Sequence, residues 1–150
     1  MRSETPRFPA RRFEVAGEPG KALATVIEEL KHGGYRFRAL DASGSIQEGR
    51  HGSLGAEFVG NVFDIPRLFN PASVPGRVIV TAEPGAHPGI TTVLVAVIRR
   101  GDKALADSVL QRVEQALARL AAAGVLLTAG AVFSAEDLPR GRPGNPRWRR

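Results

Sequence analysis

The stretch that most constrains this chain is residues 90–98, because as a strand it is apolar on both of its faces. Alternate side chains of a strand point to opposite sides of the sheet. One side would carry Val93, Val95 and Val97, and the other Leu94, Ala96 and Ile98. An antiparallel sheet with one face in water should instead alternate apolar and polar residues. We therefore expect a sheet that needs a cover on each face.

Two amphipathic helices are predicted to cover one of these faces. Residues 19–32 repeat apolar side chains at helical spacing, and Gly33 and Gly34 follow as a typical helix end. A second, longer helix is predicted for residues 102–123, with Asp102 as its N-cap. Strands are predicted at residues 12–16, 35–40, 45–51, 56–65, 77–83 and 90–99. Residues 125–133 fit either a last strand or an apolar strap.

This order of elements predicts an α+β fold with two layers. We expect an antiparallel sheet of about five to six strands, an N-terminal helix and a long C-terminal helix. The element order is similar to helix-grip and TATA-binding-protein-like layouts, although no sequence motif accompanies that likeness. Residues 12–138 would form the single domain, between a disordered basic tail at residues 1–11 and an Arg/Pro/Gly-rich disordered tail at residues 139–150.

The net charge of +6 is unevenly distributed along the chain. Residues 1–12 and 139–150 contain nine Arg and one Glu, whereas the 126 residues between them contain 12 basic and 14 acidic side chains. A protein that binds nucleic acid with its folded body usually carries a basic stripe on that body. On this count, we expect nucleic-acid binding through the tails only.

The sequence offers little to support catalysis. It has no Cys, which excludes thiol nucleophiles and disulfides and fits a cytoplasmic protein. Its three His share no metal-ligand spacing, and Gly20 and Lys21 lack the rest of a phosphate-binding loop. The longest weakly polar stretch, residues 120–135, is too short to span a bilayer. We therefore predict no catalytic residues, metal, cofactor or transmembrane segment, and favour a protein that is not an enzyme.

One short motif in the C-terminal tail suggests a partner. Residues 139–143, PRGRP, resemble the core of an AT-hook, a peptide that inserts Arg side chains into the narrow minor groove of A·T-rich DNA. The resemblance implies that Arg140 and Arg142 enter the groove. Arg147 and Trp148 would add a phosphate contact and a stacking ring. In this alternative, the folded body serves as a dimerisation scaffold.

The preferred hypothesis is a non-catalytic binding module that uses the second apolar face of the sheet. Its cover is either the chain itself, through residues 125–133 or the proline-rich stretch 64–76, or a second copy in a homodimer, or an apolar small molecule or lipid. The candidate ligand-lining residues are Tyr35, Phe37, Phe58, Phe69, Val80 and Val95. A third alternative is a helix-grip enzyme with His51 or Glu57 in its cavity.

Overall fold

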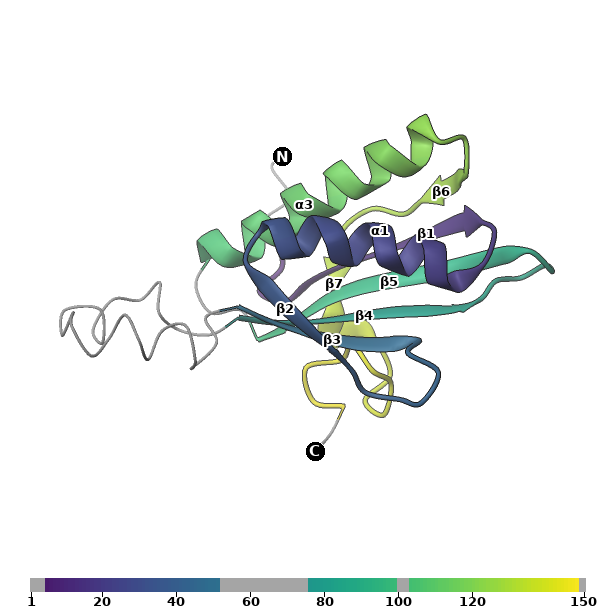
Figure 1. Ribbon diagram of the computed structural model, residues 1–150. Helices are drawn as coiled ribbons and strands as arrows, with labels where there is room; N and C mark the ends of the chain where they lie inside the picture. The colour runs from purple at the N-terminus through teal and green to yellow at the C-terminus, as the bar shows by residue number, and fades with distance from the viewer. Residues whose placement is uncertain (1–4, 52–75, 100–102, 149–150) are drawn as a thin grey trace, which may run out of the picture.

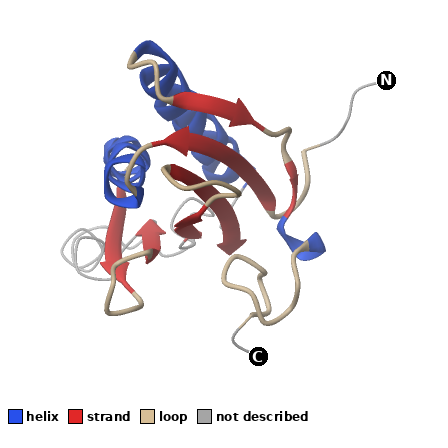
Figure 2. Cartoon of the chain, turned by 90° about the vertical axis from the view of Figure 1, so that its right-hand side faces the viewer, coloured by secondary structure: helices blue, strands red, loops and turns tan. Residues whose placement is uncertain are grey.

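A curled antiparallel sheet with two helices on one face forms the body of the protein (Figures 1 and 2). The computed structural model describes residues 5–51, 76–99 and 103–148. The strands are arranged in the order β2-β3-β4-β5-β1-β6, with the short β7 also paired to β1. Their bounds are β1 (Pro9–Ala16), β2 (Tyr35–Ala39), β3 (Ile46–His51), β4 (Gly76–Pro84), β5 (Ile90–Arg99), β6 (Leu126–Ala129) and β7 (Phe133–Ser134). The predicted α+β class is confirmed, whereas the strand expected at residues 56–65 lies outside the described residues.

The two helices begin and end where the sequence pattern places them. Helix α1 (Pro19–His32) has Pro at its first turn, where a missing N–H costs nothing. It ends at Gly33 and Gly34, the second of which has a φ of 95° that favours glycine. Helix α3 (Lys103–Ala122) turns its apolar stripe toward α1 and the sheet. No helix in the described ranges is both long enough and apolar enough to cross a bilayer.

The main core lies between the helices and one face of the sheet. Phe13, Val80 and Val95 from the three central strands are at most 2% exposed and pack against Val26 and Leu30 of α1. Burying a side chain of this size fully is worth about 1.5–3 kcal/mol. These contacts make the helix-covered face the main source of stability.

The second face of the sheet is covered in its centre by the chain itself. Leu94 and Ala96 of β5 point away from the helices and are buried under residues 135–148, which we call the C-terminal segment. This segment starts with a short 3-10 helix (Ala135–Asp137) and crosses the sheet opposite α1 and α3 (Figure 2). Leu138 and Ala135 supply its apolar contacts. The cover observed here is the protein's own chain, but not through either segment expected from the sequence: residues 126–129 form the edge strand β6, residues 64–75 lie outside the described residues, and the covering segment was expected to be largely disordered.

The structure differs from the predicted disorder at residues 139–148. These residues form turns and pack onto the sheet. Gly144 and Asn145 make the contacts that hold them there, and a composition rich in Arg, Pro and Gly does not predict such contacts. Gly144 has a φ of 112°, and a Cβ there would lie 3.0 Å from Leu94 Cδ2 and 3.1 Å from Leu138 Cδ1. Asn145 is 3% exposed and donates a hydrogen bond of 2.6 Å from Nδ2 to the Leu138 carbonyl oxygen. At the other end, β1 begins at Pro9, so residues 9–11 belong to the sheet and not to a tail.

Candidate functional site

Four arginines lie in one row across four neighbouring strands. Arg36 of β2 is directly opposite Arg50 of β3, Arg50 is opposite Arg77 of β4, and Arg77 is opposite Arg99 of β5. We call these four residues the arginine row. Directly opposite residues of antiparallel strands share a face of the sheet. Arg50 lies two residues from Glu48, and Arg77 lies two residues from Ile79. Glu48 and Ile79 are paired on the second face, so Arg50 and Arg77 face away from the helices, as does Arg36, which lies between the core residues Tyr35 and Phe37. The register shift between Arg77 and Val78 interrupts this alternation, so the pairing with Arg77 does not by itself assign Arg99 to the same face.

The row is an unfavourable arrangement for stability alone. Like charges directly opposite each other on neighbouring strands are destabilising, and here three successive pairs are Arg opposite Arg. A β-bulge between Arg77 and Val78 interrupts the register next to the last pair. Bulges are frequent beside functional sites, where they re-aim side chains. These arginine pairs therefore contribute repulsion that other interactions of the fold must offset.

One buried carboxylate partly compensates this charge. Glu48 Oε1 lies 2.8 Å from Arg50 Nε, 3.3 Å from Arg77 Nη2 and 3.6 Å from Arg38 Nη2. The Glu48 side chain is 2% exposed, whereas the Arg38 and Arg50 side chains are 60% and 48% exposed. Burial acts to raise the pKa of Glu48, but the hydrogen bond from Arg50 and the charges of the three arginines outweigh it and hold this pKa below its usual value.

Among the described residues, the balance of charge on this surface is positive. Within the described residues, Arg36 and Arg99 are exposed and make no ion pair with another side chain. Of these five arginines, counting Arg38 with the row, three lie within 3.6 Å of Glu48 Oε1, and no other carboxylate of the described residues pairs with them. The surface can therefore hold an anion without first breaking an existing pair at Arg36 or Arg99.

The turn between β2 and β3 fixes the relative position of their arginines. The Asp41 carboxylate accepts hydrogen bonds of 2.6 Å from both Ser43 Oγ and Ser45 Oγ, and one of 3.1 Å from the Ile46 backbone N–H. These hydrogen bonds lower the pKa of Asp41 to about 2. Asp41 thus remains ionised over the whole neutral and mildly acidic range and keeps the hairpin in register.

The four predicted ligand-lining residues that the structure describes lie on the helix-covered face of the sheet. Tyr35, Val80 and Val95 are buried in the core beneath the helices. Phe37 packs partly against the same core, and its ring lies across Gly49, where a Cβ would approach Phe37 Cζ to 2.6 Å. The remaining two candidates, Phe58 and Phe69, lie outside the described residues. The alternation of their strands turns the described aromatic and valine side chains inward and the neighbouring arginines outward.

The predicted nucleic-acid-binding residues of the tail are held against the sheet. Arg142 donates a hydrogen bond of 2.9 Å to Glu83 of β4, and its backbone N–H bonds the Pro139 carbonyl oxygen. The AT-hook-like pentapeptide is therefore folded in a turn, with one of its two arginines already paired. Trp148 closes a further turn, since its backbone N–H donates to the Asn145 carbonyl oxygen. Arg140 and Arg147 instead line a pocket.

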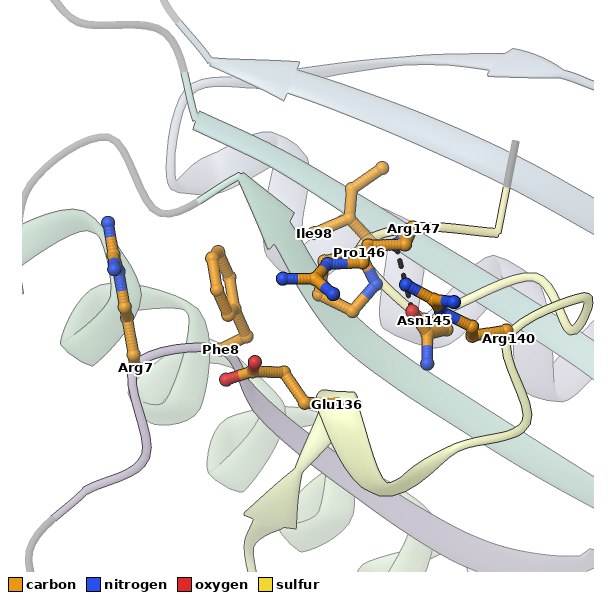
Figure 3. Close-up of a pocket in the computed structure, with 8 residues that line it drawn as sticks. All are labelled: Arg7, Phe8, Ile98, Glu136, Arg140, Asn145, Pro146 and Arg147. Carbon is orange, nitrogen blue, oxygen red and sulfur yellow. Dashed lines mark hydrogen bonds between the residues drawn. The ribbon is translucent and has the colours of Figure 1, made fainter. Parts of the chain in front are cut away.

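This pocket adjoins the arginine row. It has a volume of about 350 Å³ and lies where the C-terminal segment meets β5 and the residues just before β1 (Figure 3). Ile98, the residue next to Arg99 in β5, forms part of its wall. Its lining residues are Arg7, Phe8, Ile98, Glu136, Arg140, Asn145, Pro146 and Arg147. Three arginines and one glutamate give the pocket a positive balance.

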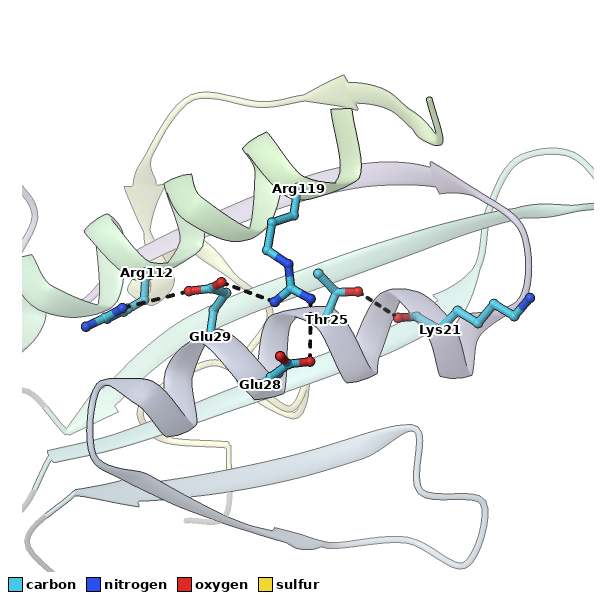
Figure 4. Close-up of polar contacts among 6 residues, drawn as sticks. All are labelled: Lys21, Thr25, Glu28, Glu29, Arg112 and Arg119. Carbon is cyan, nitrogen blue, oxygen red and sulfur yellow. Dashed lines mark hydrogen bonds and ion pairs between the residues drawn. The ribbon is translucent and has the colours of Figure 1, made fainter. Parts of the chain in front are cut away.

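The charged contacts on the other side of the molecule are structural. Arg119 of α3 lies 3.1 Å from Glu29 and 3.5 Å from Glu28 of α1, and Arg112 lies 3.8 Å from Glu29 (Figure 4). The hydrogen bond to Glu29 raises the pKa of Arg119. These pairs join the two helices. In the part of the chain that the structure describes, no group of acidic and His side chains could hold a metal ion.

The arginine row was missed by the sequence interpretation, although part of its signal was visible. Arg36 and Arg38 alternate with aromatic residues, which correctly indicates a strand with one polar face. The row becomes apparent only when the register of all four strands is known. Comparison of the sequence with protein-family models and with curated proteins finds no match.

Proposed function

We propose that this protein is a non-catalytic nucleic-acid-binding module that contacts phosphate groups through the arginine row. The observation that carries the proposal is the register of Arg36, Arg50, Arg77 and Arg99, which places like charges opposite one another on four adjacent strands. Such an arrangement becomes favourable when an anion lies across it. The proposal keeps the nucleic-acid alternative drawn from the sequence, but moves the contact surface from the tail to the sheet.

The shape and chemistry of the row favour a linear, phosphate-bearing polymer. Neighbouring strands are about 4.8 Å apart, so the row extends over roughly 14 Å. Every member is Arg, whose planar guanidinium group can donate two hydrogen bonds to one phosphate, which Lys cannot do. A series of such groups on adjacent strands of one sheet suits successive phosphates of a nucleic-acid strand better than scattered carboxylates of an acidic protein.

The apolar alternatives receive less support from the described residues. The apolar centre of the second face, at Leu94 and Ala96, is already covered by the C-terminal segment. A lipid or second subunit at this place would have to displace that segment together with the Arg142–Glu83 and Asn145–Leu138 hydrogen bonds. The exposed arginines beside it need no such displacement.

Fluorescence anisotropy with labelled 20-nucleotide single strands, measured at several salt concentrations, tests the proposal. We expect binding that weakens as salt increases, because bound phosphates release counterions. The double variant Arg36→Gln/Arg99→Gln removes two exposed charges that have no ion-pair partner among the described residues. It should weaken binding about tenfold at low salt, and should reduce the slope of log affinity against log salt by about 1.4.

The matched control removes the same charge from the opposite face. Lys21 and Lys31 are exposed on α1, so Lys21→Gln/Lys31→Gln lowers the net charge equally without touching the row. It should leave the affinity and the salt slope nearly unchanged. Equal loss in both double variants, or no binding by the unaltered protein at low salt, would refute the proposal. Displacement of the nucleic acid by polyglutamate of similar length at equal concentration would also refute it, and would indicate an acidic protein partner.

A further inference from the structure

The pocket beside the arginine row combines an apolar wall with charged side chains. Phe8, Ile98 and Pro146 provide the wall, and Arg140 and Arg147 are exposed at its rim. Its volume of about 350 Å³ lies within the range of small-ligand sites in proteins, at the small end. The combination fits a compact ligand that is flat and apolar in one part and anionic in another.

The Phe8 ring is available as a stacking surface on one side only. Arg7 lies over this ring at 5.5 Å from its centre. Figure 3 shows Arg7 on one side of the ring, and Ile98, Pro146 and the Arg147 side chain on the other. Aromatic and proline rings that face a shared space are suited to hold a planar base, since every nucleobase has a flat face that stacks on such groups.

Two of the arginines are free to take a phosphate group. Arg142 is paired with Glu83, but within the described residues the side chains of Arg140 and Arg147 have no ion-pair partner. The backbone N–H of Arg147 bonds Asn145 Oδ1, which fixes the start of its side chain at the pocket wall. Two guanidinium groups on one wall can bind a phosphate from two directions.

Glu136 supplies the one acidic group of the pocket. Its carboxylate is exposed at the end of the lining opposite Arg140, and no ion pair holds it in the described part of the chain (Figure 3). Ionised carboxylates only accept hydrogen bonds. Guanine presents two adjacent N–H donors on its Watson–Crick edge, whereas uracil presents one N–H between two carbonyl oxygens. A carboxylate in this position therefore favours guanine.

We infer that the pocket holds one guanine nucleotide, with its base beside Phe8 and Pro146, its Watson–Crick edge on Glu136 and its phosphate on Arg140 and Arg147. For a nucleotide within a strand, this inference rests on the proposed function, since Ile98 connects the pocket to Arg99 of the arginine row. For a free mononucleotide, it stands by itself. The pocket then gives a base preference to a surface that otherwise contacts phosphates without regard to sequence.

The test is a titration of the full chain with GMP, UMP and inorganic phosphate, followed by the amide NMR signals of residues around the pocket. We expect GMP to bind at least tenfold more tightly than UMP and than inorganic phosphate. Glu136→Gln should remove most of the preference for GMP over UMP, because the amide replaces one acceptor oxygen with a donor. Arg140→Gln/Arg147→Gln should weaken all three ligands, and Phe8→Leu should weaken both nucleotides but not phosphate.

The outcomes separate this inference from the proposed function. Equal affinity for GMP and UMP in the unaltered protein, or an unchanged ratio in Glu136→Gln, overturns the pocket assignment. Inorganic phosphate that binds as tightly as GMP also overturns it. Arg36→Gln, on the strand of the row farthest from β5, should leave GMP affinity unchanged while weakening the single strand. A protein that prefers GMP but binds no strand would support the pocket and refute the proposed function, and the reverse result would do the opposite.

Discussion

Asn145→Ala should release the C-terminal segment from the sheet without unfolding the domain. The Asn145 side chain donates a hydrogen bond of 2.6 Å to the Leu138 carbonyl oxygen and accepts one of 2.8 Å from the Arg147 backbone N–H. The residue is 3% exposed. Each such hydrogen bond contributes about 0.5–1.5 kcal/mol net. Losing both should therefore cost about 2 kcal/mol, which corresponds to a roughly 30-fold increase in the population of the open segment.

Hydrogen exchange of individual amides measures this opening. The backbone N–H groups of Arg142, Asn145 and Trp148 donate within the C-terminal segment and remain present in the variant. Their protection should fall about 30-fold, while amides of β4 and β5 keep theirs, because local opening leaves the central strands paired.

The matched control is Gln47→Ala, which removes a hydrogen bond of 3.0 Å from a side-chain amide to the Gly44 carbonyl oxygen in another part of the molecule. It should leave exchange in the C-terminal segment unchanged. The reasoning is refuted if these three amides exchange as fast in the unaltered protein as in a free peptide, or if Asn145→Ala leaves their exchange unchanged.

Three further predictions concern stability. Glu48→Gln should lower the free energy of unfolding by roughly 1–3 kcal/mol in urea titrations, because it leaves the arginines around it without their carboxylate. The lowered pKa of Glu48 means that its contribution is present above the ordinary value of 4.5 and is lost as pH falls through the lower folded-state value, so the variant should lose that part of the acid dependence. Asp41, whose pKa is lowered from 3.8 to about 2, should likewise add stability that disappears between about pH 4 and pH 2, and NMR titration of its carboxyl carbon in the protein and unfolding of Asp41→Asn across this range measure it. Gly144→Ala should lower the melting temperature, with a loss of about 1–2 kcal/mol, because an L-residue at a φ of 112° is strained and its Cβ would press on Leu94; an unchanged melting temperature would contradict the packing described for this segment.

The elements with strong periodicity could be predicted from the sequence, and those that depend on partners could not. The helix predicted at residues 19–32 matches α1, and the one predicted at residues 102–123 ends within one residue of α3, whereas its expected N-cap, Asp102, lies outside the described residues. Apolar spacing and the glycines at helix ends are local signals, so they predict a helix without knowledge of the tertiary fold. The β6 and β7 strands were left open, because their pairing with β1 depends on contacts more than 110 residues apart.

The arginine row could not be predicted from the sequence, because it too depends on how distant strands pair. Counting charges over the body gave a slightly acidic balance, which suggested that only the tails could meet an anion. Strand register then places arginines of four strands opposite one another, while Glu28 and Glu29 pair with arginines of α3. The order of the C-terminal segment was likewise hidden, because a proline- and glycine-rich composition conceals the specific contacts of Gly144 and Asn145.

The position of β1 has a consequence for how the chain is made. This strand lies inside the sheet, and its partners among the described strands, β5, β6 and β7, come from the second half of the sequence. During translation, β1 therefore leaves the ribosome long before its partner strands are synthesised. Until then, its apolar residues Phe13 and Val15 cannot be buried in the complete core. Strand pairing over such long sequence separations forms late, and the unpaired strand edges are prone to aggregation until it is complete. Ribosomes that stall before residue 90 would thus hold a chain in which β1 has no strand to pair with.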